Sequence, residues 1–356
     1  MKKLYTTHKY KLYHARHCMR EFSRRMRSKC KRSFSLPYIT HSHKGNTNWI
    51  NKNKVSAPEI FCIKENPKEV VKFINKLNNY LENRIPAFID LSKVTYIAHD
   101  AIVVLLSILS LFRKRGIDFN GNFPNDDRCR HTLTNSGFFS NLYETQSVKY
   151  DTSAQSKNVI RKHGKEASGS VAKELIAICT QNIWAQKCRC QGVYRILIEL
   201  MQNTHAHASH QAPGTENWWL AVNYDSNSNK ECFSFVDYGM GVFSSLEGKR
   251  ENEKFYGMLD VLRKKLIDPS NAKLLQSILE GELHKTSTGE SYRGKGLPGI
   301  RQALERNQIS NLYIITNDVY ANVCENNFAT LQHAFNGTFI YWELTENNIK
   351  CYDKEY

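Results

Sequence analysis

The sequence is organised around the stretch Tyr194-Arg-Ile-Leu-Ile-Glu-Leu-Met-Gln-Asn-Thr-His-Ala-His207. Its apolar residues recur with the spacing i, i+1, i+4, i+5, which predicts a helix with one apolar stripe. Glu199, Asn203 and His207 are spaced four residues apart, so they lie along a second face of that helix. A row of carboxylate, amide and imidazole beside an apolar stripe predicts a functional surface on this helix.

A first glycine-containing turn follows this helix in the sequence. The alternating strand pattern at 233–236 ends in Asp237-Tyr-Gly239-Met-Gly241, an acid followed by two glycines. An acid buried at a strand end accepts hydrogen bonds from amino groups, such as that of adenine. The alternative for Asp237 is an Asx residue that only forms the turn.

A second glycine turn lies further along the chain. It consists of Gly294, Lys295, Gly296, Leu297, Pro298 and Gly299. A helix is predicted to begin there and to run to about Arg306. Backbone N–H groups at the start of a helix bind phosphates, and glycines let the backbone approach them closely. Lys295 adds a point charge, or it is a solvated loop lysine.

Glu199 and Asn203 are the residues that carry the predicted chemistry. A carboxylate and an amide one helical turn apart suit a Mg²⁺ shell and a water to be activated. Glu199 is the candidate general base; the alternative is a surface carboxylate that pairs with Arg195. We interpret His207 as a phosphate contact. His205 points roughly 200° away from it around the helix, so these histidines are not predicted to bind a metal.

Taken in order, these motifs resemble the GHKL ATPase superfamily, which includes gyrase, heat-shock chaperones and sensor histidine kinases. Glu199-x-x-x-Asn203 resembles the N-box of that family, and the turns at 237–241 and 294–299 resemble its two glycine boxes. The resemblance covers about 167–345. It implies a Bergerat-type α/β sandwich at 170–345, with a mixed sheet and helices on one face, that binds Mg²⁺ and ATP.

The resemblance also implies roles for individual residues. Asn203 is expected to be the Mg²⁺ ligand, with Glu199 nearby, and Asp237 is expected to bind the adenine. The glycines at 239 and 241 shape the base pocket, and those of the second turn cradle the phosphates. The segment at about 244–293 corresponds to the ATP lid, with helices predicted at 254–267 and 271–282.

An earlier segment, 57–145, alternates between strand and helix patterns and predicts a small sheet with helices against it. Its helices are expected at 67–82, 100–115 and 126–139. The phrase from Ala87 to Ala101 resembles the STAS fold of anti-sigma-factor antagonists. Signalling members of that family carry a phosphorylatable Ser or Thr where this chain has Ala98-His99-Asp100. His99 is therefore either a substitute phosphoacceptor or part of a His-Asp pair at a helix N-cap.

The remaining segments are predicted to connect or flank these two parts. Residues 1–50 form a basic tail, 46–56 and 150–169 are linkers, and 346–356 form a C-terminal tail. The turn at 226–229 predicts a hairpin between strands at 216–224 and 230–237. Further strands are expected at 311–316, 319–323 and 337–344, which complete an antiparallel sheet.

Charge is concentrated in the basic tail. Residues 1–45 hold thirteen Lys and Arg against the single acid Glu21, a surplus of twelve, whereas the net charge of the whole chain is +16. Such a segment binds nucleic acid or an anionic membrane surface, or it is a solvated extension.

The chain shows neither a secretory signal nor a membrane-spanning run, since its longest apolar run, 101–112, is too short. Its ten cysteines indicate reduced thiols in a cytoplasm. The sequence therefore predicts a bacterial cytoplasmic signalling protein that hydrolyses Mg-ATP as a switch for a protein partner. The alternatives are an anti-sigma-type serine/threonine kinase that acts on a STAS partner, and a non-catalytic nucleotide-binding adaptor with a nucleic-acid-binding tail. The oligomeric state stays open.

Overall fold

The computed structural model describes residues 53–143, 158–163, 168–208, 218–248, 256–282 and 296–348, with backbone alone at 158–163 and 205–208. Contacts divide the chain into one unit that ends at Lys52 and a second that begins at Asn53. All described residues belong to the second unit. The basic tail at 1–45 lies outside the described residues.

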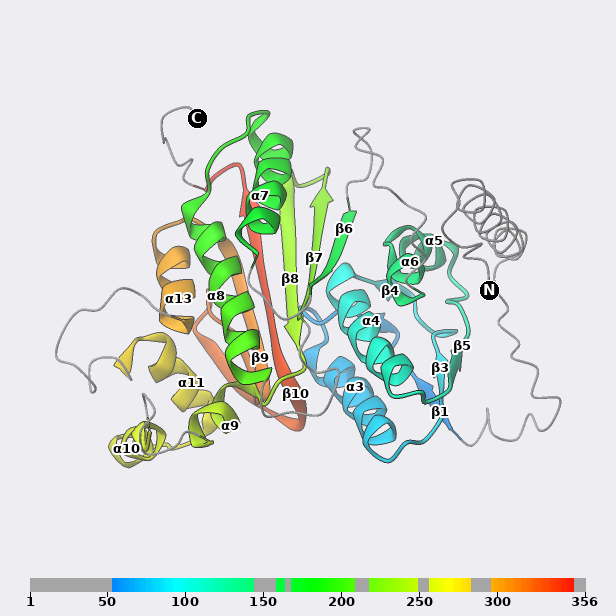
Figure 1. The fold of residues 1–356 in the computed structure, drawn as a ribbon, viewed down its shortest axis with the longest axis horizontal. Helices are drawn as coiled ribbons and strands as arrows, with labels where there is room; N and C mark the ends of the chain where they lie inside the picture. The colour runs from blue at the N-terminus through cyan, green and yellow to red at the C-terminus, as the bar shows by residue number, and fades with distance from the viewer. Residues whose placement is uncertain are drawn as a thin grey trace, which may run out of the picture. The chain divides into compact units, whose positions relative to one another are not determined.

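A five-stranded sheet forms the centre of the fold (Figure 1). Its strands, in spatial order, are β6 (Asn158–His163), β7 (Trp218–Asp225), β8 (Lys230–Asp237), β10 (Asn327–Thr345) and β9 (Ser310–Asn322). All four pairings are antiparallel, so the expected mixed sheet is wrong. The reason is local: β7–β8 and β9–β10 are hairpins with short connections, and such connections join antiparallel strands. The predicted hairpin around 226–229 is confirmed.

Four helices cover one face of this sheet. They are α7 (Gly169–Trp184), α8 (Gln191–Ala208), α11 (Asn271–Leu279) and α13 (Leu297–Glu305). Alternate strand residues, among them Trp218, Phe233 and Trp342, are buried against these helices. The rings of Phe233 and Trp342 stack with centroids 5.0 Å apart. Two short helices, α9 (Gly241–Glu247) and α10 (Met258–Lys265), follow β8 in the chain.

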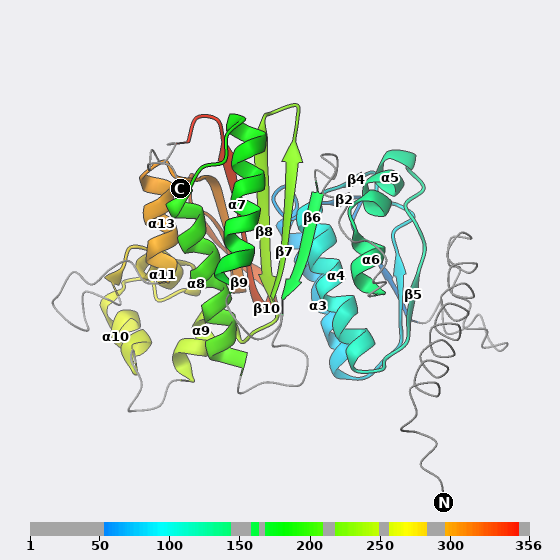
Figure 2. The ribbon, with the colours of Figure 1, turned by 45° about the horizontal axis from the view of Figure 1, so that its top comes forward.

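The opposite face of the sheet is covered by α3 (Pro67–Glu82) and α4 (His99–Lys114) (Figure 2). Here the other set of alternate residues, including Trp219, Val236 and Phe339, shares a core with these two helices. The four helices of 170–345 named above lie on one face, as expected; the cover of the second face by helices of the segment 57–145 was not predicted. The strands β7, β8 and β10 carry apolar residues at both parities, so both faces require cover.

The segment before β6 has the predicted alternation of strands and helices. Strands β1 (Lys54–Ser56), β3 (Ala87–Asp90) and β5 (Phe119–Gly121) form a parallel sheet, and β2 (Ile60–Phe61) pairs with β4 (Tyr96–Ile97). The expected helices at 67–82 and 100–115 are confirmed as α3 and α4. The chain is therefore a mixed α/β protein, and its segments 57–145 and 170–345 share a core through α3 and α4.

Two expectations about linkers are corrected. The structure has β1 in the segment 46–56 and β6 in the segment 150–169, both of which were expected to be irregular. Both strands are edge strands that join a sheet through backbone hydrogen bonds. Their pairing needs no apolar alternation of their own, so the sequence pattern did not predict them.

Three element boundaries also differ from expectation. The single helix expected at 126–139 is two helices, α5 (Asp127–Asn135) and α6 (Phe138–Leu142), because Gly137 between them has φ +80°. The strands expected at 311–316 and 319–323 are one strand, β9, with irregular pairing at Asn317. Strand β10 begins at Asn327, earlier than the expected 337.

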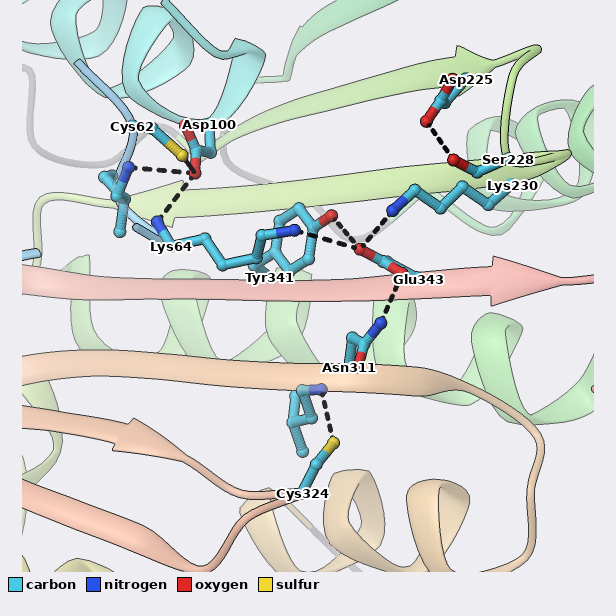
Figure 3. A network of polar contacts seen from close by, with 12 residues as sticks. Cys62, Lys64, Asp100, Asp225, Ser228, Lys230, Asn311, Cys324, Tyr341 and Glu343 are labelled. Carbon is cyan, nitrogen blue, oxygen red and sulfur yellow. Dashed lines mark hydrogen bonds and ion pairs between the residues drawn. The ribbon is translucent and has the colours of Figure 1, made fainter. Parts of the chain in front are cut away.

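A polar network joins the α4 layer to the sheet (Figure 3). The buried carboxylate of Glu343 in β10 accepts hydrogen bonds from Tyr341 Oη at 2.5 Å and Asn311 Nδ2 at 2.6 Å. Lys230 Nζ lies 3.2 Å and Lys64 Nζ 3.7 Å from the same carboxylate. The backbone N–H of Lys64 donates to the buried Asp100 of α4. Lys64 thus connects the start of α4 to the centre of the sheet.

Among the helices of the described residues, none has the length and apolar character that crossing a membrane would require.

Candidate functional site

Helix α8 has the predicted apolar stripe, which fixes the orientation of its polar face. Ile196, Leu197 and Met201 are buried in the core between the helices and the sheet. The side chains of Glu199 and Asn203 are half-buried on the same helix.

The carboxylate of Glu199 lies beside the second glycine turn. A Cβ atom placed on Gly296 would be 3.6 Å from Glu199 Oε1. Gly296 has φ +80° and precedes α13, whose first turn is closed by a bond from Gly299 N to Gly296 O of 2.9 Å. Helices α8 and α13 are in contact. The structure thus brings Glu199 next to the described part of this turn.

Asp237, at the end of β8, is the centre of a second group of contacts. Its Oδ1 accepts hydrogen bonds from Gly239 N at 3.1 Å and Thr338 N at 3.2 Å. Its Oδ2 accepts a bond from Thr204 Oγ1 of α8 at 3.3 Å. A carboxylate has about four acceptor sites, so these three bonds leave capacity for one further donor. Asp237 therefore forms the Asx turn that was the alternative reading, and it can still accept a bond from a ligand.

Burial sets the acidity of Asp237. Desolvation raises the pKa of this carboxyl to about 6, against the opposing effect of the hydrogen bonds from Gly239, Thr338 and Thr204. At neutral pH the group is mostly ionised and acts purely as an acceptor. Around pH 6 it gains a proton, which makes the site sensitive to pH in an accessible range.

The described glycines and Leu297 occupy distinct places. Gly241 is buried with φ +73°, and Gly239 supplies the N–H that bonds to Asp237. Gly299 is buried at the start of α13, and Leu297 packs against the core of the helix layer. Leu297 thus anchors the start of α13, and Gly241 and Gly296 supply the positive φ angles of the two turns.

Several predicted site residues lie outside the described residues. These are Gly294 and Lys295, together with the side chain of His207 and the lid segments 249–255 and 283–293. Of the expected lid helices, α10 and α11 are present at Met258–Lys265 and Asn271–Leu279. Among the described residues, no group of three or more His, Cys, Asp or Glu side chains could hold a metal ion.

His99 and Asp100 belong to the other side of the sheet. His99 and Asp100 are the first two residues of α4, so the expected His-Asp pair lies at the start of the helix, and the N-cap itself is Ala98. Burial lowers the pKa of His99 to about 4. Asp100 accepts bonds from the N–H groups of Ile63 and Lys64, both at 3.1 Å. Because α4 and α8 cover opposite faces of the sheet, the geometry does not favour His99 as an acceptor for chemistry at Glu199.

Two residues of the site were missed by the sequence interpretation. Thr204 directly follows Asn203 and bonds to Asp237, and Thr338 donates its backbone N–H to the same carboxylate. A hydroxyl next to a predicted ligand is a weak signal, because threonine is common on helices. Thr338 carries no sequence signal for this contact, since the bond comes from its backbone and depends on the pairing of β8 with β10.

In comparisons with known proteins, the chain matches no family model and no curated protein sequence.

Proposed function

We propose that this chain is a bacterial cytoplasmic regulatory protein that binds Mg-ATP at a GHKL-type site and hydrolyses it as a conformational switch. The proposal rests on the position of α8. Glu199 of this helix lies beside Gly296 of one turn, and Thr204 bonds to Asp237 of the other. Five residues along a helix correspond to about 7.5 Å, a distance that fits between the base and the phosphates of one nucleotide.

The residues present fit the parts of a nucleotide. Asp237 retains one acceptor position for an amino group such as that of adenine, and at neutral pH it is ionised. At the start of α13, Pro298 has no N–H and the N–H of Gly299 bonds to Gly296 O, so Leu297 is the residue of this first turn whose N–H would be offered to a phosphate oxygen. Asn203 and Glu199 would supply oxygen ligands to a Mg²⁺ ion, which keeps most of its waters and neutralises phosphate charge.

Glu199 is the residue that would hold a proton during turnover. Its half-buried carboxylate lies beside the turn, which supports a role in orienting a water and accepting its proton. The free cysteines among the described residues agree with a reducing compartment. Tyr238, next to Asp237, is buried in the core that α3 and α4 share with the sheet. A change at the site could therefore be transmitted to α3 and α4 and to a protein partner that binds them.

The test is incubation of the protein with γ-labelled ATP and Mg²⁺. We expect wild type to release labelled phosphate and Glu199→Ala to release it at least roughly 100-fold more slowly, the usual contribution of a general base. Calorimetry should show that Glu199→Ala still binds ATP. Asn203→Ala should lose both activities if the amide holds the ion.

Other outcomes of this experiment would identify the alternatives. Label transferred to Ser or Thr of a STAS protein would show a kinase of the anti-sigma type. Binding without release or transfer would show an adaptor. Absence of any calorimetric signal with adenosine nucleotides would refute the site altogether.

The pH dependence of binding gives an independent prediction. An amino group of the base bonds to the ionised form of Asp237, whose pKa is about 6. We therefore expect the affinity for ATP to be constant above pH 7 and to fall roughly tenfold for each pH unit well below 6. Calorimetric titrations between pH 5 and 8 measure this, with Asp237→Asn as a control that should bind weakly at every pH.

The sign is opposite for the stability of the free protein. The folded pKa of Asp237 is raised above the value of an unfolded chain, so folding favours the protonated carboxyl. This contribution is fully present below the unfolded pKa and is lost as the pH rises through about 6. ATP binding and ligand-free stability should thus respond to this group in opposite directions, and parallel changes would contradict its assignment.

A further inference from the structure

The turn from Asp237 to Gly241 is held from outside by strand β9. This turn leads directly into α9, whose own N-cap residue, Met240, makes no side-chain cap hydrogen bond. The first N–H groups of a helix have no partner within the helix and require one elsewhere. Here the partners are two neighbouring side chains of β9, Thr316 and Asn317.

Asn317 makes three hydrogen bonds to this turn. Its Oδ1 accepts from Phe243 N at 3.2 Å, and its Nδ2 donates to Met240 O at 3.0 Å and to Ser244 Oγ at 3.3 Å. The same amide thus bonds to the backbone on both sides of Gly241, to Met240 before it and to Phe243 after it. Neither an apolar residue nor a carboxylate could reproduce this pattern.

The backbone of Asn317 is adapted to this role. Asn317 has φ +51°, a conformation that asparagine tolerates better than most residues, and the pairing of β9 with β10 is irregular there. The irregularity turns the amide toward Gly241, where an added Cβ would be only 2.3 Å from Asn317 Oδ1. Gly241 is therefore needed because the amide occupies the space of a side chain.

Thr316 also holds this turn, and we call Thr316 and Asn317 together the β9 clamp. Its buried Oγ1 accepts a bond from Val242 N at 2.9 Å and donates to Gly337 O at 3.2 Å. Gly337 immediately precedes Thr338, whose N–H bonds to Asp237. The β9 clamp is thus connected to the Asp237 carboxylate in two ways. It bonds to the segment that follows Asp237, and it bonds to Gly337, the neighbour of Thr338 in β10.

We infer that Asn317, supported by Thr316, is a positioning residue that fixes the Asp237 carboxylate for base selection. The inference rests on the proposed nucleotide site and adds a residue to it. In this role Asn317 acts by holding the bend that orients Asp237. Loss of the Asn317 side chain should change the ratio of the ATP and GTP affinities more than it changes the contribution of the triphosphate to binding.

The experiment compares ATP and GTP affinities for wild type, Asn317→Gly and Asn317→Asp by calorimetry. Glycine keeps φ +51° accessible and removes the amide, whereas aspartate keeps the acceptor and removes the donor. We expect wild type to prefer ATP, and Asn317→Gly to lose roughly tenfold of that preference, the effect of one displaced charge-assisted hydrogen bond. Asn317→Asp should lie between the two, and GTP affinity should change less than twofold.

The matched control is Asn326→Gly, which removes another asparagine with positive φ (+52°), in the turn between β9 and β10. It should leave the ATP preference unchanged. A lower melting temperature of Asn317→Gly with an unchanged ATP preference would overturn the inference, because it would show a merely structural role. If Asn317→Gly does not fold, the preference of Asn317→Asp decides. Wild type that binds neither nucleotide would overturn both the inference and the proposed function, whereas binding without a difference between variants overturns the inference alone.

Discussion

Gly337→Ala should lower the free energy of unfolding by about 3 kcal/mol, because the added methyl group would clash with the backbone of β8. Its Cβ would lie 2.0 Å from Asp237 O and 3.0 Å from Tyr238 Cα, both of which are backbone atoms. Gly337 also has φ +134°, which residues with a side chain rarely adopt. Strands β8 and β10 must move apart there to admit the methyl group.

The same change should weaken the proposed binding of ATP. Thr338, the next residue, pairs with Asp237 in the sheet and donates its N–H to the carboxylate. Separation of the strands lengthens this bond and shifts Asp237. Urea unfolding and calorimetry with ATP, performed on the same preparation, measure the two effects together.

Gly116→Ala is the control for backbone strain. Gly116 has φ +65° at the end of α4, and a Cβ there would meet no atom within 4 Å. It should cost about 1 kcal/mol, the effect of positive φ alone, and leave ATP binding intact. Equal losses of stability for both variants would show that the close approach of β10 to Asp237 is not what matters.

Glu343→Ala should have an effect of similar size, about 3 kcal/mol, for an electrostatic reason. Glu343 is 1% exposed, and four side chains converge on it. Although burial opposes ionisation, the hydrogen bonds from Tyr341 and Asn311, together with Lys230, lower the pKa of Glu343. Its removal leaves Lys64 and Lys230 without their shared counter-charge and the Tyr341 hydroxyl without its acceptor.

Urea denaturation followed by circular dichroism measures this loss. A single transition is expected, since α3 and α4 share their core with the sheet, and the midpoint should fall while the slope stays constant. Glu280→Ala is the control: Glu280 pairs with Arg301 at 3.3 Å, but its side chain is 39% exposed. Its loss should cost less than about 1 kcal/mol. A Glu343→Ala variant as stable as this control would contradict the account of the buried network.

Local patterns predicted most of the helices. Helix α3 begins at Pro67, directly after Asn66, and α8 has an apolar stripe that is visible in the sequence alone. Both signals depend on residues within one or two turns of each other. The strands β1 and β6 were missed because their order comes from neighbours far along the chain.

The candidate site divides in the same way. Glu199, Asn203, Asp237 and the glycines could be selected because carboxylate, amide and glycine have restricted uses at such spacings. Thr338, Thr316 and Asn317 could not, since each acts on a segment to which only strand pairing brings it.

The sequence by itself determined most of the helices and the residue types of the proposed nucleotide site, because hydrophobic periodicity and glycine turns act over short distances. Only the tertiary structure decided that α3 and α4 cover the second face of the sheet and that β6 joins the sheet beside β7. It also decided that α8 lies between the two turns, with Glu199 at one and Thr204 at the other. Such contacts arise from packing and long-range pairing, which no local pattern encodes.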